Sequence, residues 1–407
     1  MQDTPKANRL HIAILGRRNA GKSSLINALT QQEIALVSEV AGTTTDPVFK
    51  AMEILPIGPC MIIDTAGIDD EGQLGELRIK KSREVLNQTD LALLVIDPAL
   101  GISEYELELK QEIQSRKIAL IGVLNKIDQG KFDKKSLEKQ LGLSLVAVSS
   151  LSREGIELLK ERIIERAPTH FEEAHIVGDL IEPGDICLLV VPIDLAAPKG
   201  RLILPQVQTI RDLLESDATV MVVKENQLRQ ALEGLKKKPR LLITDSQVFG
   251  KVAPQTPDEV MLTSFSILFA RFKGDLLELV RGAKAIEKLR PGDQVLIAEA
   301  CTHHAQDDDI GRVQIPRWLN RYVGGELDFH WYSGSGYPEN LEQFKLVVHC
   351  GACMINRRQM LHRIDLARES GVPIVNYGVL LAFVNGILER TLQPFPQARA
   401  VLKEEQA

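Results

Sequence analysis

The sequence predicts an α/β protein built from three domains. At 407 residues the chain is longer than one hydrophobic core normally organises. Short apolar runs alternate with stretches whose apolar residues recur at helical spacing, a pattern typical of parallel sheets covered by helices. The polar segment 167–173 and a second break near residue 260 interrupt this pattern. We therefore place the domains at 1–170, 175–260 and 261–407.

Composition and charge narrow the class of protein. Apolar residues make up 44% and charged residues 26% of the chain, and the formal net charge is -6. The longest basic run, Lys236-Lys237-Lys238, is too short for an extended contact with a nucleic-acid backbone. The first residues are polar, and no apolar run reaches the roughly eighteen residues of a membrane-spanning helix. We expect a cytoplasmic protein with no nucleic-acid partner and no membrane partner.

The first expected strand, His11 to Leu15, leads into the pattern G-x-x-x-x-G-K-S at residues 16–23. Between a strand and a helix, such a loop binds nucleotide phosphates, because main-chain N–H groups and the positive helix end face the anion. Lys22 would reach the outer phosphates, and Ser23 would bind Mg²⁺. The predicted phosphate-binding residues are Gly16, Asn19, Gly21, Lys22, Ser23 and Ser24.

Three further motifs each follow an expected strand. Asp64-Thr65-Ala66-Gly67 places a carboxylate where it can hold Mg²⁺. Asn125-Lys126-Ile127-Asp128 supplies a carboxylate for the two donors of the guanine edge, which adenine lacks, and Ser149-Ser150 offers main-chain donors to the guanine oxygen. The four motifs in this order predict a GTPase domain. The nucleotide-binding residues assigned from the last three motifs are Asp64, Gly67, Asn125, Lys126, Asp128, Ser149 and Ser150.

Residues 11–166 resemble the translation-factor-related GTPases, nearest to the branch that contains the tRNA-modification GTPase MnmE and the ribosome-assembly GTPase Era. The segment Gly42-Thr43-Thr44-Thr45-Asp46 matches the G-T-T-x-D segment of that branch. The resemblance implies a magnesium role for Thr44, with the two adjacent threonines as alternatives.

The same resemblance bears on hydrolysis. Ile68 stands where Ras-like enzymes keep a glutamine that orients the attacking water. Isoleucine cannot do this, so we expect slow hydrolysis unless another group stabilises the transition-state charge. Relatives with asparagine at the position of Asn19 hold K⁺ there, which implies potassium stimulation with Lys22, Asn19 and Thr44 as catalytic residues. Alternatively, Asn19 only accommodates a tight turn.

The second domain, 175–260, shows apolar strands, amphipathic helices and no catalytic cluster. A small α/β unit of this kind is a candidate for pairing with a second copy through a sheet edge or a helix face. We therefore expect a homodimer or a higher oligomer.

Cysteine and histidine residues follow two expected strands of the third domain. Cys301 and His303 come after the strand Gln294 to Ala298, and His349-Cys350-Gly351-Ala352-Cys353 follows the strand Lys345 to Val348. Parallel strands end at one sheet edge, where ligand sites open. We expect the two segments to meet there and to form a metal site.

The ligand chemistry alone leaves two metal centres open. Structural zinc uses sets of three cysteines and one histidine, or of two cysteines and two histidines. Three thiolates from separate strand ends also suit a cubane 4Fe-4S cluster with one iron left for another ligand. His303, His349, an acidic side chain or solvent could provide the fourth ligand.

The order of motifs, with C-x-H and a distant H-C-x-x-C downstream of a GTPase domain, resembles the HydF family of FeFe-hydrogenase maturation GTPases along the whole chain. The resemblance implies cluster ligands at Cys301, Cys350 and Cys353, with His303 and His349 as accessory groups. It also implies dimers through the middle domain, and a scaffold that receives a di-iron precursor from the radical SAM enzymes HydE and HydG and delivers it to apo-hydrogenase. The alternative is an RNA- or ribosome-associated GTPase with a structural zinc domain.

Overall fold

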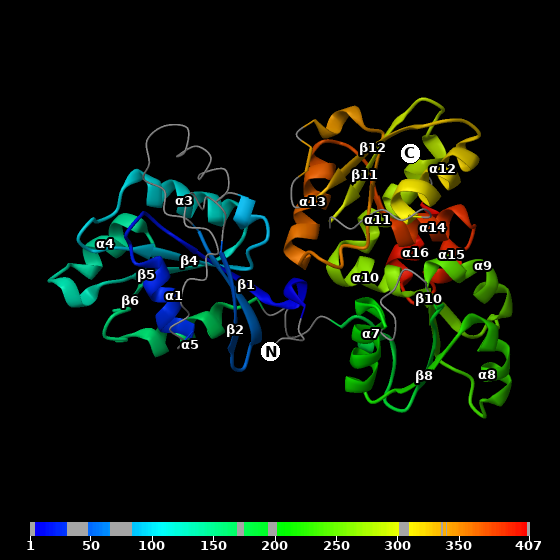
Figure 1. Ribbon diagram of the computed structural model, residues 1–407, viewed down its shortest axis with the longest axis horizontal. Helices are drawn as coiled ribbons and strands as arrows, with labels where there is room; N and C mark the ends of the chain where they lie inside the picture. The colour runs from blue at the N-terminus through cyan, green and yellow to red at the C-terminus, as the bar shows by residue number, and fades with distance from the viewer. Residues whose placement is uncertain are drawn as a thin grey trace. The chain divides into compact units, whose positions relative to one another are not determined.

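The computed structural model describes residues 5–30, 48–65, 84–168, 175–193, 202–300, 309–334, 337–338 and 340–404. The chain divides into two compact units, Met1–Glu173 and Ala174–Ala407. Figure 1 shows the units with their helices and strands. In the described parts of the chain, no helix is long and apolar enough to cross a membrane.

The first unit is a six-stranded sheet of order β2-β3-β1-β4-β5-β6, in which only β2 runs antiparallel to its neighbour. Alternate residues of the central strand β1 enter opposite cores: Ile12 and Ile14 pack with residues of α1 and α5, while Ala13 and Leu15 pack with residues of α3 and α4. Because helices cover both faces, the strand is buried along its whole length, and its residues other than His11 are apolar. The strands and helices are β1 (Leu10–Leu15), α1 (Lys22–Thr30), β2 (Val48–Ile54), β3 (Gly58–Asp64), β4 (Leu91–Ile96), α3 (Glu104–Ser115), β5 (Ala119–Leu124), α4 (Lys134–Leu141), β6 (Leu145–Ala147) and α5 (Ile156–Arg166).

The second unit begins with a four-stranded parallel sheet of order β10-β9-β7-β8. Its elements are β7 (Ile186–Val190), α7 (Leu204–Glu215), β8 (Thr219–Val223), α8 (Leu228–Gly234), β9 (Leu241–Thr244), α9 (Phe249–Val252) and β10 (Met261–Ser264). The sequence analysis starts the third domain at residue 261, which is the first residue of β10. In the structure this strand pairs with β9, so the second sheet continues to Ser264.

The third sheet of the chain is also parallel and has the order β12-β11-β13-β14. The helices α10 and α11 precede this sheet in the chain, and α14 directly follows its last strand, β14. The elements are α10 (Phe265–Lys273), α11 (Leu276–Ala285), β11 (Gln294–Glu299), α12 (Ile315–Val323), β12 (Asp328–Ser333), β13 (Leu346–His349), α13 (Arg357–Glu369), β14 (Ile374–Asn376), α14 (Tyr377–Val384), α15 (Leu388–Thr391) and α16 (Pro396–Lys403).

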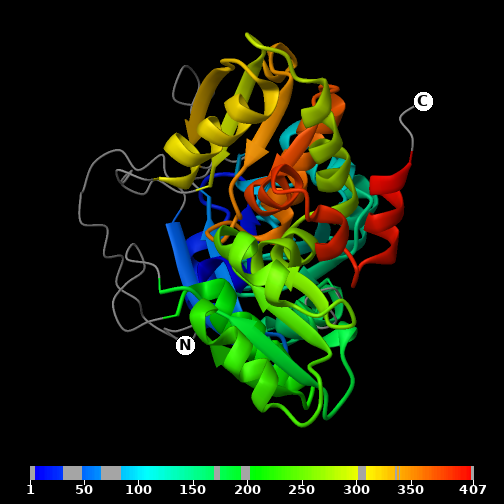
Figure 2. The ribbon, with the colours of Figure 1, turned by 90° about the vertical axis from the view of Figure 1, so that its right-hand side faces the viewer.

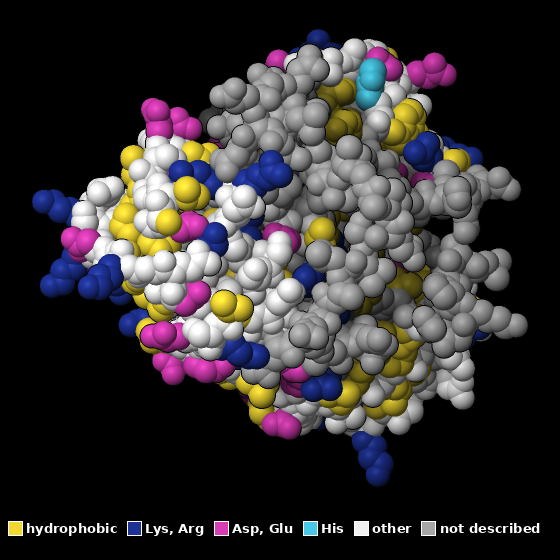
Figure 3. Space-filling model, turned by 60° about the vertical axis from the view of Figure 1, so that its left-hand side comes forward, with side chains coloured by type: hydrophobic (Ala, Val, Ile, Leu, Met, Phe, Trp, Pro, Cys, Tyr) yellow, Lys and Arg dark blue, Asp and Glu magenta, His cyan; other side chains and the backbone are white. Residues whose placement is uncertain are grey.

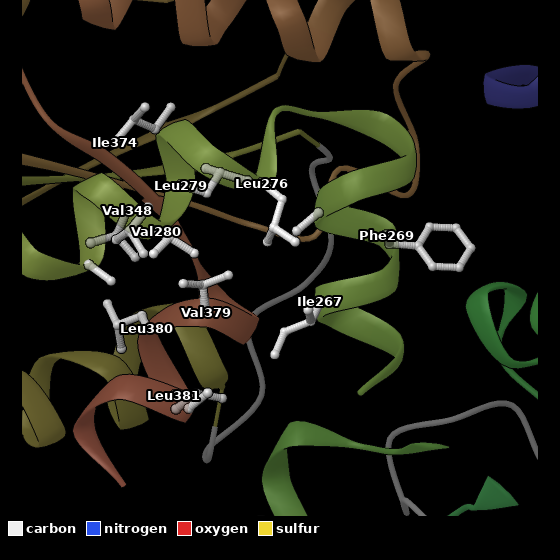
Figure 4. Close-up of a cluster of buried hydrophobic side chains, with 14 of the residues drawn as sticks. Ile267, Phe269, Leu276, Leu279, Val280, Val348, Ile374, Val379, Leu380 and Leu381 are labelled. Atoms are coloured by element: carbon white, nitrogen blue, oxygen red, sulfur yellow. The ribbon is translucent and has the colours of Figure 1, made fainter. Parts of the chain in front are cut away.

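One hydrophobic core joins the two sheets of the second unit. It contains Leu189 from β7, Val348 from β13 and the helix residue Ile267. Figure 4 shows side chains of α10, α11 and α14 meeting in this core, and Figure 2 shows the same helices between the two sheets. Gly282 of α11 lies so close to β14 that an added Cβ would stand 1.8 Å from the Ile374 carbonyl oxygen. The helix can approach the strand only because this residue has no side chain.

Candidate nucleotide site and candidate metal centre

The loop between β1 and α1 has the conformation that its glycines allow. Gly16 (φ 144°) and Gly21 (φ 86°) adopt backbone angles that favour glycine. A Cβ on Gly16 would lie 2.3 Å from the Val95 carbonyl oxygen, and one on Gly21 would lie 2.3 Å from Asn125 Nδ2. Asn19 is also left-handed, at φ 60°, a conformation that asparagine tolerates better than most residues. The G-x-x-x-x-G-K-S pattern therefore folds as the sequence predicts.

Lys22 and Ser23 stand at the first turn of α1. The buried Lys22 donates from Nζ to the carbonyl oxygens of Gly16 and Arg17, each at 2.8 Å. Ser23 Oγ donates to Asp64 Oδ2 at 3.0 Å. Burial raises the pKa of Asp64, against the opposing effects of the Ser23 hydrogen bond and the charges of Lys22 and Lys50. A hydroxyl and a carboxylate oxygen thus meet beside the loop, a donor set that suits Mg²⁺.

The predicted guanine-binding residues lie at the ends of β5 and β6. Asn125 Nδ2 donates to the Ala20 carbonyl oxygen at 3.1 Å, and its Oδ1 accepts from Ser150 Oγ at 2.8 Å. Ser149 Oγ donates to Asp128 Oδ1 at 2.6 Å. The side chain of Asn125 therefore ties the phosphate-binding loop to the Ser149-Ser150 loop. Lys126 pairs with Asp97, 2.7 Å from Nζ to Oδ2.

One contact of the nucleotide site was not predicted. Arg17 Nε donates to Glu106 Oε1 at 2.6 Å, and Glu106 is almost fully buried. The other carboxylate oxygen accepts from the main-chain N–H and the hydroxyl of Ser103, the residue immediately before α3. This capping box is readable in the sequence as Ser103-x-x-Glu106. Its link to the phosphate-binding loop is a tertiary contact that no local pattern reveals.

The strand ends of the third sheet converge as predicted. Ala298 of β11 lies opposite His349 of β13, and the N–H of Cys350 donates to the Ala298 carbonyl oxygen at 2.9 Å. The N–H of Ala300 donates to Cys350 Sγ at 3.2 Å. Cys350 is therefore held beside the residue that precedes Cys301 in the sequence. Cys350 and Cys353 are partly exposed, whereas Cys60 and Cys187 are buried.

Two buried cations flank residues 350–355, which carry Cys350 and Cys353 and are called the cysteine turn below. Lys273, the last residue of α10, donates from Nζ to the carbonyl oxygens of Ala352, Cys353 and Ile355 at 3.3, 3.2 and 2.9 Å. Burial lowers its pKa to about 8, and the charges of the two cysteines act against this shift. Arg363 of α13, buried as well, donates to the Gly334 carbonyl oxygen.

His349 is predicted as an accessory group of the metal centre, and its side chain contacts the cysteine turn. It is fully buried, and its Nε2 accepts from Arg363 Nη1 at 2.8 Å. Since Arg363 can only donate, Nδ1 carries the proton and donates to the Cys350 carbonyl oxygen at 2.8 Å. Burial and the charge of Arg363 lower the pKa of His349 to about 3. Both ring nitrogens are thus engaged, and the neutral ring supports the cysteine turn.

Glu299, at the end of β11, is a buried carboxylate on the side of β11 that faces β12. Glu299 Oε2 accepts from Ser333 Oγ at 3.3 Å, and Oε1 accepts from Tyr377 Oη at 3.4 Å. Burial raises the pKa of Tyr377 above the ordinary range, with further contributions from Cys350, Glu299 and Asp309. The Tyr377 hydroxyl therefore stays protonated and can donate. Within the described ranges, which leave out 301–308, no group of three or more His, Cys, Asp or Glu side chains could hold a metal.

Four predicted site residues lie outside the described residues: Thr44, Gly67, Cys301 and His303. The others fall into two groups, one around the phosphate-binding loop and one around the cysteine turn. Ser24 follows Ser23 in α1 and is exposed.

Comparison with known proteins decides the family. A model of the hydrogen maturase F dimerization domain matches residues 176–274, and a model of the hydrogen maturase F tetramerization domain matches residues 277–394. The chain belongs to the hydrogen maturase F family. Within this member of the family, residues 11–126 match the model of the 50S ribosome-binding GTPases. The first unit is therefore a GTPase domain, and the two sheets of the second unit correspond to family domains named for self-association.

Individual relatives match part of this chain. The tRNA modification GTPase MnmE of Aquifex aeolicus is 38% identical over 164 residues, which are 40% of this chain and 36% of that protein. GTPase Der of Campylobacter jejuni is 31% identical over 224 residues, 48% of either chain. The chain thus spans a third to a half of the length of these relatives.

Solved structures match over a similar part. The crystal structure of Era from Aquifex aeolicus is 21% identical and covers 53% of this chain and 93% of its own, with a TM-score of 0.34. The G domain of the FeoB transporter from T. maritima is 29% identical and covers 39% and 98%, with a TM-score of 0.31.

Proposed function

We propose that the chain is a GTPase and an iron–sulfur scaffold in FeFe-hydrogenase maturation. It would hold a 4Fe-4S cluster through Cys301, Cys350 and Cys353. It would also receive a di-iron precursor from HydE and HydG and deliver it to apo-hydrogenase. The observation that carries the proposal is the cysteine turn at the carboxyl end of a parallel sheet, flanked by two buried cations, in a member of the hydrogen maturase F family.

The arrangement of the nucleotide site supports GTP binding and hydrolysis. The Lys22 ammonium, which here contacts carbonyl oxygens of its own loop, can turn to the phosphate oxygens of GTP. Ser23 and Asp64 would hold Mg²⁺, which would neutralise charge on the phosphates. Asp128 accepts a hydrogen bond from Ser149 on one carboxylate oxygen, and its carboxylate would accept the two donors of the guanine edge.

Asn19 tests the potassium part of the proposal. Its left-handed backbone suits the turn explanation, and its side-chain oxygen suits the potassium explanation. Asn19→Gly separates the two, because glycine keeps the backbone conformation and removes the oxygen. We expect wild-type hydrolysis to be faster in K⁺ than in Na⁺, and Asn19→Gly to abolish that difference. Equal rates in the two salts for the wild-type chain would contradict a potassium role.

The donor set and the charge around the cysteines support an iron–sulfur cluster. Cys350 and Cys353 bring two thiols to one turn, and Cys350 is held beside Ala300. A cubane bound by three thiolates carries net negative charge, and the buried Lys273 and Arg363 would balance it. Zinc bound by three thiolates is also an anion, so charge alone does not separate the two metals.

Anaerobic reconstitution tests the metal. The purified chain is incubated with iron and sulfide, and its iron, sulfide and zinc contents are measured together with its absorption and electron paramagnetic resonance spectra. We expect about four iron and four sulfide per wild-type chain. Cys350→Ala should lose the cluster and keep GTP hydrolysis, while Cys187→Ala, a buried thiol of β7, should keep both. Stoichiometric zinc without an iron–sulfur signal would contradict the cluster.

An RNA- or ribosome-associated GTPase with structural zinc is the second candidate. The GTPase family model named for ribosome binding favours it. On the face drawn in Figure 3, described Lys and Arg side chains are interspersed with Asp and Glu and form no single basic patch. Salt-sensitive RNA binding by a zinc-containing, colourless protein would support this candidate over the scaffold.

The edge of the second sheet is the proposed dimer surface. β8 is an edge strand, and apolar side chains are exposed on it and on α7: Val207 at 48%, Leu214 at 54% and Val222 at 44%. A second copy that covers this face would bury them and complete the strand edge. Leu214→Glu with Val222→Glu should convert the dimer to monomers in sedimentation experiments. An unchanged sedimentation coefficient would place the dimer contact elsewhere.

A further inference from the structure

The end of α10 and the cysteine turn hold each other through two cations. Lys273 donates to three carbonyl oxygens of the turn. Arg357, four residues after Cys353, donates from Nη1 to the carbonyl oxygens of Arg271, Phe272 and Gly274 at 3.1, 2.6 and 3.0 Å. The last carbonyl groups of a helix lack hydrogen-bond donors within the helix. Arg357 donates hydrogen bonds to the carbonyl oxygens at the end of α10, and Lys273 donates them to the carbonyl oxygens of the turn. We call these two residues the latch.

Hydrogen bonds to the carbonyl oxygens of the turn do not by themselves require a charged side chain at position 273. An amide or hydroxyl could donate to the same oxygens, whereas an ammonium that is only 2% exposed carries a desolvation penalty unless a negative charge lies near. Lys273 Nζ contacts the main chain of the cysteine turn itself, so a cluster bound by Cys350 and Cys353 would supply that negative charge. The neighbouring Asp275 acts on Arg357 instead.

We propose that Lys273 is a positioning residue and fixed counter-charge of the metal centre: it holds Cys350 and Cys353 in their ligating arrangement and raises the reduction potential of the cluster bound there. This inference rests on the proposed function. A fixed positive charge stabilises the more negative, reduced form of a cluster, so its removal lowers the potential. Arg357 has a different part, since its guanidinium contacts the helix end and not the cysteine turn.

Three variants of the full chain separate the contact from the charge. Lys273→Gln keeps a hydrogen-bond donor and loses the charge. Lys273→Met loses both. Lys284→Met is the matched control. Lys284 also donates from Nζ to main-chain carbonyl oxygens, but these belong to Val401 and Glu404, near the C-terminal end of the second unit.

Each variant is reconstituted with iron and sulfide without oxygen, and its iron content and midpoint potential are measured by dye-mediated titration. Lys273→Gln should bind a cluster with a more negative potential than wild type. Lys273→Met should bind less iron, and Lys284→Met should match wild type in both. A wild-type potential in Lys273→Gln overturns the counter-charge. If Lys273→Gln is folded by circular dichroism and binds no cluster, the charge is needed for binding itself, which supports the inference.

Arg357→Gln keeps the inference testable if the Lys273 variants do not fold. It opens the other half of the latch and leaves the ammonium in place, so iron content should fall while the potential of the bound cluster stays at the wild-type value. A lowered potential in Arg357→Gln would contradict the division of roles. A wild-type chain that takes up no iron and sulfide would contradict the proposed function itself. A wild-type cluster that is indifferent to Lys273 would contradict only this inference.

Discussion

Lys22 and Lys273 perform the same local task in two different regions. Both are buried lysines, 6% and 2% exposed, and both donate to carbonyl oxygens of a loop at the carboxyl ends of parallel strands. Lys22 stands in the first turn of its helix, where the helix dipole also favours an anion. Lys273 stands in the last turn, where a cation balances the negative helix end.

The difference shows how position on a helix decides what a buried cation does. At the start of α1 the ammonium contacts carbonyl oxygens of its own loop. The main-chain N–H groups of a helix start favour an anion, so we expect an incoming phosphate to replace the carbonyls. At the end of α10 the ammonium is enclosed by three carbonyls of one turn, so it remains part of the framework. We therefore expect Lys22 to govern ligand affinity and Lys273 to govern stability and the properties of a bound metal centre.

The largest expected effect is that of Lys22→Ala on the nucleotide site. Loss of the ammonium should lower the rate of GTP hydrolysis at least about a hundredfold, since it removes a charge directed at the phosphates. Phosphate release and nucleotide affinity measure this. Lys110→Ala is the control, because Lys110 donates to the Leu141 carbonyl oxygen in the same unit and should leave the rate unchanged. If Lys22→Ala hydrolysed GTP at the wild-type rate, Lys22 would not act on the nucleotide, and the proposed difference between Lys22 and Lys273 would be wrong.

Lys273→Met should destabilise the second unit without affecting nucleotide binding. It removes a buried donor from three carbonyl oxygens, which should reduce the free energy of unfolding by about 1–3 kcal/mol. Denaturant titration of the metal-free chain, followed by circular dichroism, measures the change. Unaltered stability would mean that water satisfies the same carbonyls and that Lys273 is not part of the framework.

Glu106→Gln should have a smaller effect, confined to the nucleotide site. Glutamine can keep the capping box with Ser103 but loses the charge that pairs with Arg17. We expect nucleotide affinity to fall severalfold, equivalent to about 1 kcal/mol. Glu112→Gln on the same helix, which loses its pair with Arg116, should bind nucleotide as the wild type does. Equal affinities in both variants would show that Arg17 does not need its partner.

The smallest expected effect concerns pH and the pair Arg271–Asp179. Burial opposes ionisation of Asp179, but the hydrogen bonds and charge of Arg271 outweigh it and hold the pKa of the carboxyl below its usual value. The stability from this pair is therefore present above the ordinary aspartate pKa of about 4 and is lost as pH falls through the lowered value. Asp179→Asn should make the unit less stable at neutral pH by at most about 1 kcal/mol. It should also flatten the acid side of the stability profile, and an unchanged profile would contradict the assignment.

Much of the nucleotide site could be predicted from the sequence because its chemistry is local. Gly16, Gly21 and Lys22 stand at fixed offsets in one loop, and each of the other motifs ends a strand. The strand-end convergence at Cys350 was predictable for the same reason, since parallel strands share an edge.

What the sequence could not reveal depends on partners far along the chain. Lys273 ends an amphipathic helix and reads as a solvated residue, yet it contacts a turn about eighty residues later. His349 adjoins Cys350 and resembles a ligand, and its engagement depends on Arg363 from the next helix. The sequence of the strand Met261–Ser264 does not indicate which sheet it joins, so only its pairing with β9 shows where it belongs.

The core shared by the two sheets of the second unit has a consequence for experiments on the whole chain. The family domains meet between residues 274 and 277, immediately after α10, while the core runs from Ile176 to Val401. A fragment that ends at residue 274 would expose the apolar face of α10, and the remaining fragment would lose Lys273. The unit should therefore melt in one cooperative transition, and self-association and metal binding are better separated by single substitutions than by cutting the chain.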